Sequence, residues 1–165
     1  MSTARYWRAR ALAGGLWLVA APATAATCTV ANGTLAFGSY NPVSASPATA
    51  TTSITDSCSA LLGFGNTDTV SYSILLSGGN SGNTASRRMS FGANNLPYNL
   101  YTSGSYGAVW DNTSGVSDSF VLRGLLGLPL LVLGNSSKTV YGRILAQQPA
   151  VSGAYADSLL ITVNY

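Results

Sequence analysis

Apolar and polar residues alternate along the last thirteen positions of the chain, residues 153–165, which read GAYADSLLITVNY. Alternation with a period of two is typical of a β-strand that buries one of its faces. The mostly apolar face carries Tyr155, Asp157, Leu159, Ile161, Val163 and Tyr165. The pattern therefore predicts a half-buried closing strand, and no later residue in this sequence would pair with it or cover its apolar face.

Short apolar or alternating runs recur along the rest of the chain, separated by stretches rich in Gly, Asn, Ser and Pro that favour turns. They occupy residues 29–40, 48–58, 69–77, 89–91, 98–101, 108–112 and 139–147. A longer apolar run, residues 120–134, is interrupted by Arg123 and Pro129, which favours buried strands or an interface segment over a membrane span. About seven short strands without a convincing helix predict an all-β fold, an antiparallel β-sandwich.

The start of the chain has the composition of a leader. Residues 1–10 contain three arginines and no acid, residues 11–22 are mostly apolar, and residues 23–25 read Ala-Thr-Ala. A basic start, a short apolar region and a small-x-small site are the three parts of a secretory signal peptide. A membrane anchor would need about 20 apolar residues, and this run has twelve. We therefore expect a signal peptide over residues 1–25 and one exported domain over residues 26–165, with no membrane span after cleavage.

Export changes the charge balance of the chain. The full sequence carries a net charge of +3, but three of its eight basic residues lie in the leader. The remaining five basic residues are balanced by five aspartates, so the charge gives no argument for nucleic acid as a partner. Outside the leader, the one adjacent basic pair is Arg87 and Arg88, which we expect to be the solvated start of a strand.

The sequence contains two cysteines, Cys28 and Cys58, both in the exported part. In an oxidising compartment an even pair is expected to form a disulfide. If the chain folds back at Val43, within the turn-forming residues 41–47, position 28 faces position 58. A bond there would close the open end of a hairpin and contribute roughly 3 to 4 kcal/mol. A free thiol pair or a metal pair are the alternatives.

Residues suited to catalysis are scarce. The chain has no histidine, and all five of its acidic residues are aspartates. A Ser-His-Asp triad and a His-based metal site are therefore excluded. Asp111 and Asp118 remain as a pair for glycoside hydrolysis, but aspartates in polar loops are commonly turn formers. We expect a protein that is not an enzyme and that has no cofactor.

Four aromatic residues cluster in a stretch rich in Asn, Ser and Gly: Tyr98, Tyr101, Tyr106 and Trp110. Aromatic faces with amide neighbours suit stacking on sugars or on abiotic surfaces, which makes these residues a candidate binding surface. The alternative is that most of them lie in the core or on strand edges.

Several segments of the exported part match one known pattern. VYGRILAQQ (residues 140–148) is followed by SGAYADSLLITVNY (residues 152–165), and the exported part begins with CTV…GTLAFGSYNP and its paired Cys58. Over essentially the whole exported part the chain resembles the spore coat protein U domain family, which includes the pilin subunits of archaic, Csu-type chaperone–usher pili. The most specific part of the match is carried by Tyr141, Gly142, Arg143, Gln147, Gly153, Tyr155, Asp157, Leu159, Thr162, Val163 and Tyr165.

The resemblance implies an incomplete immunoglobulin-like β-sandwich that lacks its final strand. A groove would lie between the first strand and the last, bounded by Leu35, Phe37, Leu159, Ile161, Val163 and Tyr165. A periplasmic chaperone would fill the groove first, and a strand donated by a neighbouring pilin subunit would replace it at an outer-membrane usher. The chain would then be a secreted structural or adhesive subunit of a surface pilus, or fimbrium. The rival functions are a spore- or cell-surface coat protein outside an usher fibre, and a sugar-binding module.

A polymerising pilin of this family carries a donor segment ahead of its first cysteine. Cleavage after residue 25 leaves Ala26 and Thr27 before Cys28, which reach about 7 Å, whereas a donor strand needs about ten residues. We therefore expect a subunit that accepts a strand but does not donate one, at the distal end of a fibre. Mass spectrometry of the exported protein should find Ala26 at its N-terminus. An N-terminus about ten or more residues ahead of Cys28 would contradict this expectation.

Overall fold

The computed structural model describes residues 27–62, 67–123 and 130–165. Their strands are β1 (Thr27–Asn32), β2 (Ala48–Leu62), β3 (Thr67–Leu76), β4 (Arg88–Phe91), β5 (Asn94–Pro97), β6 (Asn99–Tyr101), β7 (Val116–Arg123), β8 (Leu130–Ile144) and β9 (Ile161–Asn164). Two short 3-10 helices, η1 (Gly79–Ser81) and η2 (Thr84–Ser86), lie between β3 and β4. The predicted signal peptide lies outside the described residues, as do residues 124–129 of the long apolar run. Within the described part, no helix has the length and apolar content needed to cross a membrane.

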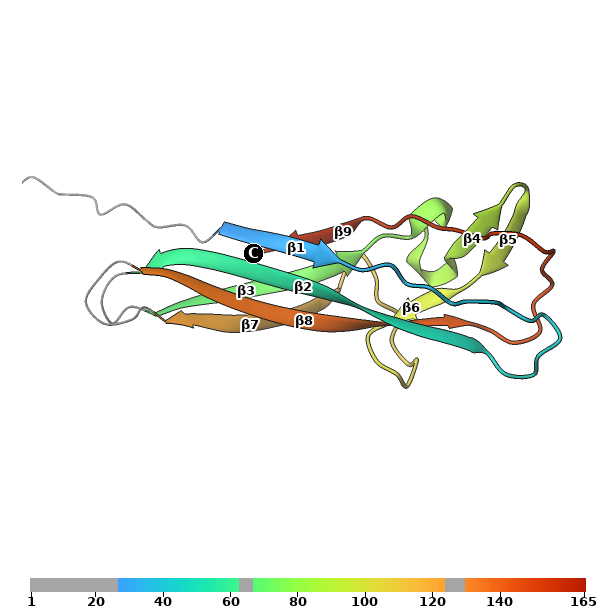
Figure 1. The fold of residues 1–165 in the computed structure, drawn as a ribbon, viewed down its shortest axis with the longest axis horizontal. Helices are drawn as coiled ribbons and strands as arrows, with labels where there is room; N and C mark the ends of the chain where they lie inside the picture. The colour runs from blue at the N-terminus through green and yellow to red at the C-terminus, as the bar shows by residue number, and fades with distance from the viewer. Residues whose placement is uncertain (1–26, 63–66, 124–129) are drawn as a thin grey trace, which may run out of the picture.

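The strands form two antiparallel sheets that face each other along an elongated molecule (Figure 1). One sheet has the strand order β1-β2-β8-β6 and the other has the order β7-β3-β9, while β4 and β5 form a separate hairpin. The predicted all-β antiparallel sandwich is confirmed.

Two predicted strands are shorter than the sequence indicates. The run at residues 29–40 is paired as a strand only as far as Asn32, and the closing run at residues 153–165 only over Ile161–Asn164. Both runs still alternate between more buried and more exposed side chains over much of their length. The alternation reflects packing against the core, whereas strand pairing needs a neighbouring backbone, and most of these two segments has none beside it.

The N-terminal hairpin forms because its turn residues favour the reversal. The Asn41 side chain accepts a hydrogen bond from the Val43 N–H at 3.1 Å, and the Asn41 carbonyl accepts one from the Ser44 N–H at 3.1 Å. Strand β2 then returns so that Cys58 lies opposite Cys28, and the two form a disulfide. The predicted cysteine pairing is therefore confirmed.

The core occupies the space between the sheets. Its largest member is Trp110, which is 1% exposed and whose indole N–H donates to the Ile74 carbonyl at 2.8 Å. Burying one large apolar side chain stabilises a fold by about 1.5–3 kcal/mol, so the core is the main source of stability. Its other buried members are Ile54, Tyr72, Ile74, Leu76, Leu96, Tyr98, Leu100, Val140 and Ile144.

The two long edges of the sandwich differ. On one side Lys138 of β8 forms a salt bridge with Asp118 of β7, which joins the two sheets. The Lys138 ammonium lowers the pKa of the Asp118 carboxyl, with a smaller contribution from the Ser119 N–H. On the other side β1 and β9 are the outermost strands of their sheets, and no pairing joins them in the described part of the chain. The two sheets are thus linked by a salt bridge on one side, whereas on the other side β1 and β9 are not paired with each other (Figure 1).

Arg87, expected to be solvated, is fully buried, so the prediction was wrong for this residue, whereas its neighbour Arg88 is exposed as expected. Burial lowers the pKa of the Arg87 guanidinium, and no carboxylate forms a salt bridge with it in the described chain. All five of its N–H groups instead donate hydrogen bonds of 2.7–3.3 Å. The acceptors are the carbonyls of Leu76, Ser77, Thr84 and Trp110 and the Oδ1 atom of Asn99. Arg87 therefore joins the end of β3, η2, β6 and the segment before β7.

Replacing Arg87 by methionine would leave these buried acceptors without a donor. We expect Arg87→Met to lower the free energy of unfolding by roughly 3 kcal/mol or more, since each buried polar group left unpaired costs about 1–3 kcal/mol. Arg88→Met removes the same charge at the exposed neighbouring position and should change stability by less than about 0.5 kcal/mol. Urea denaturation of the two variants measures the difference. Equal stabilities would contradict the role assigned to Arg87.

Asp56 is a second ionisable group in the interior. It lies on β2 with its side chain between the sheets, near Tyr165, and it is 0% exposed. Neither of its carboxyl oxygens has a hydrogen bond of normal geometry within the described residues. Burial raises the pKa of the Asp56 carboxyl, and the nearby Tyr165 hydroxyl opposes this rise only in part. The fold therefore favours the protonated acid.

The protonated form of Asp56 stabilises the fold below the pKa of an unfolded aspartate, about 3.9. This contribution is lost as the pH rises through the higher folded-state pKa. Asp56→Asn should therefore raise the free energy of unfolding at pH 7 and leave it close to the wild-type value at pH 4. Asp118→Asn is the matched control with the opposite sign, because its folded-state pKa is lowered and its charged form is the stabilising one. Parallel stability profiles of wild type and Asp56→Asn between pH 4 and pH 8 would refute the prediction.

Candidate functional site: an open apolar groove

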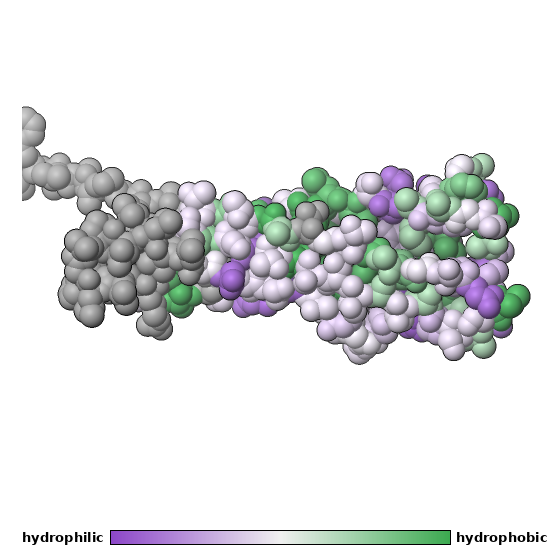
Figure 2. Space-filling model, viewed as in Figure 1, coloured by the Kyte–Doolittle hydropathy of each residue, from purple (hydrophilic) through white to green (hydrophobic). Residues whose placement is uncertain are grey.

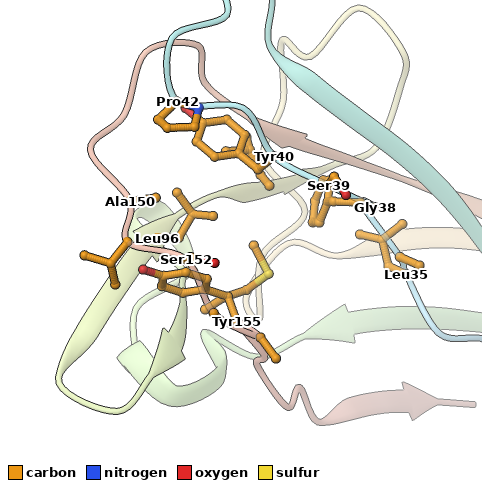
Figure 3. Close-up of a pocket in the computed structure, with 16 residues that line it drawn as sticks. Leu35, Gly38, Ser39, Tyr40, Pro42, Leu96, Ala150, Ser152 and Tyr155 are labelled. Atoms are coloured by element: carbon orange, nitrogen blue, oxygen red, sulfur yellow. The ribbon is translucent and has the colours of Figure 1, made fainter.

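The open side of the sandwich contains a cavity of about 720 Å³. It lies between two segments, the N-terminal wall (residues 33–42), which follows β1, and the C-terminal wall (residues 150–160), which precedes β9. Tyr40 on the first wall and Tyr155 on the second lie on opposite sides of the cavity, and Leu96 also lines it (Figure 3). Apolar side chains reach the surface on this side of the molecule (Figure 2). We call this cavity, together with its continuation along β9, the groove.

A glycine allows the N-terminal wall to lie directly on β8. A Cβ atom at Gly142 would lie 2.4 Å from a Leu35 methyl group and 2.7 Å from the Phe37 ring, so any larger residue would displace both side chains. Phe37 also packs edge-on against Tyr98, with 5.8 Å between the ring centroids. Leu35 and Phe37 are therefore inserted toward the core although their backbone belongs to no strand.

Both ends of the N-terminal wall are attached to the rest of the molecule. At one end, the preceding strand β1 is held by the disulfide from Cys28. At the other end, the Tyr40 hydroxyl donates to the Leu145 carbonyl at 2.9 Å and accepts from the Gln148 N–H at 2.8 Å. The wall is thus fixed to β2 and to the loop after β8.

The C-terminal wall is attached at Ala156, Asp157 and Leu160. The Leu160 carbonyl accepts a hydrogen bond from the Ser77 N–H at 3.0 Å, and the Leu160 N–H donates to Ser77 Oγ at 2.8 Å. Ala156 and Ser90 exchange two backbone hydrogen bonds of 2.8 and 3.1 Å. The Asp157 carboxylate accepts hydrogen bonds from the Tyr98 hydroxyl at 2.8 Å and from the Asn80 N–H at 2.7 Å. Burial raises the pKa of Tyr98, which keeps its hydroxyl protonated and able to donate. These contacts fix the wall to β4, to Tyr98 between β5 and β6, to η1 and to Ser77 after β3.

Away from these attachment points, most of the backbone of both walls is unpaired. In the described chain, no backbone hydrogen bond involves residues 34–40, and none involves residues 150–155 or Leu159. Backbone N–H and C=O groups that are not paired within the protein must bond to water or to another chain. The groove therefore presents two free backbone edges above an apolar floor, which is the arrangement that accepts an added β-strand.

The structure places the six predicted groove residues along this side but not all in the cavity. Leu35 and Phe37 line the cavity. Leu159, Ile161 and Val163 continue the apolar row along the C-terminal wall and β9, half-buried against the core. Tyr165 is 56% exposed at the end of the row, with its ring 6.4 Å from that of Tyr72.

Several cavity residues were not identified from the sequence: Tyr40, Met89, Leu96, Ile144, Ala150 and Tyr155. Tyr155 belongs to the alternating row at the carboxyl end, so the pattern itself could have included it. Met89 and Leu96 come from the β4–β5 hairpin, whose position over this side depends on tertiary contacts. No sequence signal locates that hairpin.

The four aromatic residues proposed as a binding surface separate into two pairs. Tyr98 is 7% exposed and Trp110 is 1% exposed, and both belong to the core, as the alternative interpretation holds. Tyr101 and Tyr106 are half-buried, with their rings packed edge-on and 5.4 Å between the centroids. Neither of these two tyrosines lines the groove cavity.

The two aspartates considered for glycoside hydrolysis have structural partners. Asp111 Oδ1 accepts hydrogen bonds from three backbone N–H groups, which lower the pKa of its carboxyl. Asp118 is held by Lys138. Among the residues that the structure describes, no cluster of three or more His, Cys, Asp or Glu side chains could hold a metal ion.

Comparisons with known proteins agree with this geometry. No curated protein matches the chain. One solved structure that matches is the pre-assembly complex of the chaperone CsuC with the tip adhesion subunit CsuE, from the archaic chaperone-usher Csu pili of Acinetobacter baumannii. The TM-score is 0.52 with 18% sequence identity, over 86% of this chain and 40% of that chain, which supports the predicted immunoglobulin-like fold.

The family comparison covers most of the sequence. A model of the Spore Coat Protein U domain matches residues 16–162. This is a family of structural proteins rather than enzymes. With its open sandwich and this match, the chain belongs to the Spore Coat Protein U domain family.

Proposed function

We propose that the groove receives a β-strand from another polypeptide and that the protein is a structural subunit of a chaperone–usher surface fibre. The observation that carries the proposal is the pair of unpaired walls above an apolar floor. A strand entering between them would bond to the free N–H and C=O groups of residues 34–40 and 150–155. Because side chains alternate along a strand, every second one would be placed on the floor.

The expected gain from such a strand is large. About ten inserted residues would bury about five side chains, and at roughly 1.5–3 kcal/mol each this is on the order of 10 kcal/mol before the cost of ordering the strand. That gain is comparable with the stability of a whole domain, about 5–15 kcal/mol. An open apolar edge also favours aggregation. The subunit would therefore need a partner from the moment it folds.

Two successive partners satisfy this need. A periplasmic chaperone would occupy the groove first, and a neighbouring pilin subunit would replace it at an outer-membrane usher, which brings the protein to the cell surface. The CsuC–CsuE complex joins a chaperone to a pilus subunit, and the similar fold supports the same order of events here. An exported protein also meets the oxidising conditions that the Cys28–Cys58 disulfide needs.

We place the subunit at the distal end of the fibre, as an acceptor of a strand that donates none. The support is the predicted leader, since cleavage after residue 25 leaves two residues ahead of Cys28. A terminal subunit is exposed to the surroundings, which suits an adhesive role. A coat protein that assembles without an usher would use the same groove, and it is the second candidate because the matching family model is described as a spore coat domain.

Substitutions at two adjacent leucines test whether the groove binds a strand of the chaperone. Leu159 packs against the core beside the groove, whereas Leu160 is 69% exposed. We expect Leu159→Asp to reduce co-purification with the chaperone at least tenfold, because a carboxylate would be buried under the inserted strand. Leu160→Asp makes the same chemical change on the outer side and should leave co-purification unchanged.

Other outcomes of this experiment decide between the candidates. Equal loss in both variants, or a wild-type protein that is soluble and folded without any partner and gains no stability from one, would contradict the strand-acceptor proposal. Surface display that persists in cells lacking the usher would favour the coat protein.

A further inference from the structure

A second pocket, of about 410 Å³, lies on another part of the molecule, between η2, β5, β6 and β8. It shares no lining residue with the groove cavity. Its size falls within the range of pockets that bind small ligands, about 300–1,000 Å³. An inserted strand that fills the groove would therefore leave this pocket open.

The pocket is strongly cationic. Three of its lining residues are Arg87, Arg88 and Arg143, and no lining residue among those described is acidic. Arg87 uses all its N–H groups internally, so it supplies charge but no free donor. Arg88 and Arg143 form no salt bridge and no hydrogen bond with another described residue. Three arginines of a chain with five basic residues outside its leader thus line this pocket, and no described acidic residue lines it with them.

The Arg143 side chain is held in place by aromatic rings. Its guanidinium carbon lies 5.1 Å from the centroid of the Tyr106 ring, and Tyr106 packs edge-on against Tyr101, a lining residue. Tyr106 has a φ of 57°, which is unfavourable for a bulky residue. Backbone strain of this kind is concentrated at binding sites, where the surrounding structure maintains it. The residue with this strained backbone is also the one whose ring contacts Arg143.

We propose that this pocket binds the carboxylate of an acidic sugar, as found in polymers that contain uronic acids. The guanidinium groups of Arg88 and Arg143 match the planar, bidentate geometry of a carboxylate. The Tyr101 ring, which lines the pocket, offers an apolar surface to the C–H face of the sugar ring. A pocket with two unpaired arginines next to an aromatic ring fits this ligand better than an acidic peptide, whose flexible backbone would leave Tyr101 without a flat partner.

Isothermal titration calorimetry with trigalacturonic acid tests the proposal. The protein is the exported chain in the form in which it is isolated, free or chaperone-bound, with the chaperone alone as the blank. Arg143→Gln and Arg88→Gln should each weaken binding about tenfold or more, the loss expected for a charge-assisted hydrogen bond. Arg123→Gln removes the same charge from β7, which supplies no lining residue to the described pocket, and should keep the wild-type affinity.

Two further measurements test the proposal: thermal unfolding of the Arg88→Gln variant and binding of an uncharged ligand. Arg88 is exposed, so its variant should fold normally, and an unchanged thermal unfolding midpoint verifies this. The neutral methyl ester of the same trimer should bind at least tenfold more weakly than the acid. No binding of the acid at millimolar concentration, equal binding of the ester, or equal binding of a triglutamate peptide would each overturn the assignment.

Discussion

The backbone groups of residues 34–40 and 150–155, which make up most of the two walls of the groove, have no partner within the described chain, and the rest of the groove is arranged around this constraint. A peptide group that faces water can form hydrogen bonds to it, so its exposure costs little free energy. An apolar side chain that faces water costs much more free energy. Phe37 and Tyr155 are therefore half-buried against the core while their backbone stays unpaired. The apolar side chains of these segments are thus packed within the protein, while the backbone hydrogen-bonding groups beside them are left unpaired in the described chain.

The residues around the groove are held in place by contacts within the protein, without an inserted strand. Arg87 joins four parts of the chain through buried hydrogen bonds, and Trp110 packs beside them in the core. On the opposite side, the Lys138–Asp118 salt bridge links β8 of one sheet to β7 of the other. These contacts hold the two sheets together around the groove.

The sequence pattern could predict the sandwich, the hairpin and the disulfide because each depends on local signals. The alternation at the carboxyl end identifies inward residues such as Leu159 and Val163, and the turn at residues 41–47 places Cys28 opposite Cys58. It could not predict the burial of Arg87, because an adjacent arginine pair in a polar turn looks solvated, and most of its acceptors lie ten or more residues away along the chain. It also could not show that Trp110 is enclosed, since the sequence around it is polar.

The N-terminal wall is secured at both ends, by the disulfide from Cys28 and by the Tyr40 hydroxyl between Leu145 and Gln148. Because it is held at both ends, the N-terminal wall cannot detach and occupy the groove itself. The groove is therefore preorganised, and a strand inserted as proposed would give up only its own conformational freedom. Reduction of the Cys28–Cys58 disulfide would remove one of the two attachments and with it part of this preorganisation.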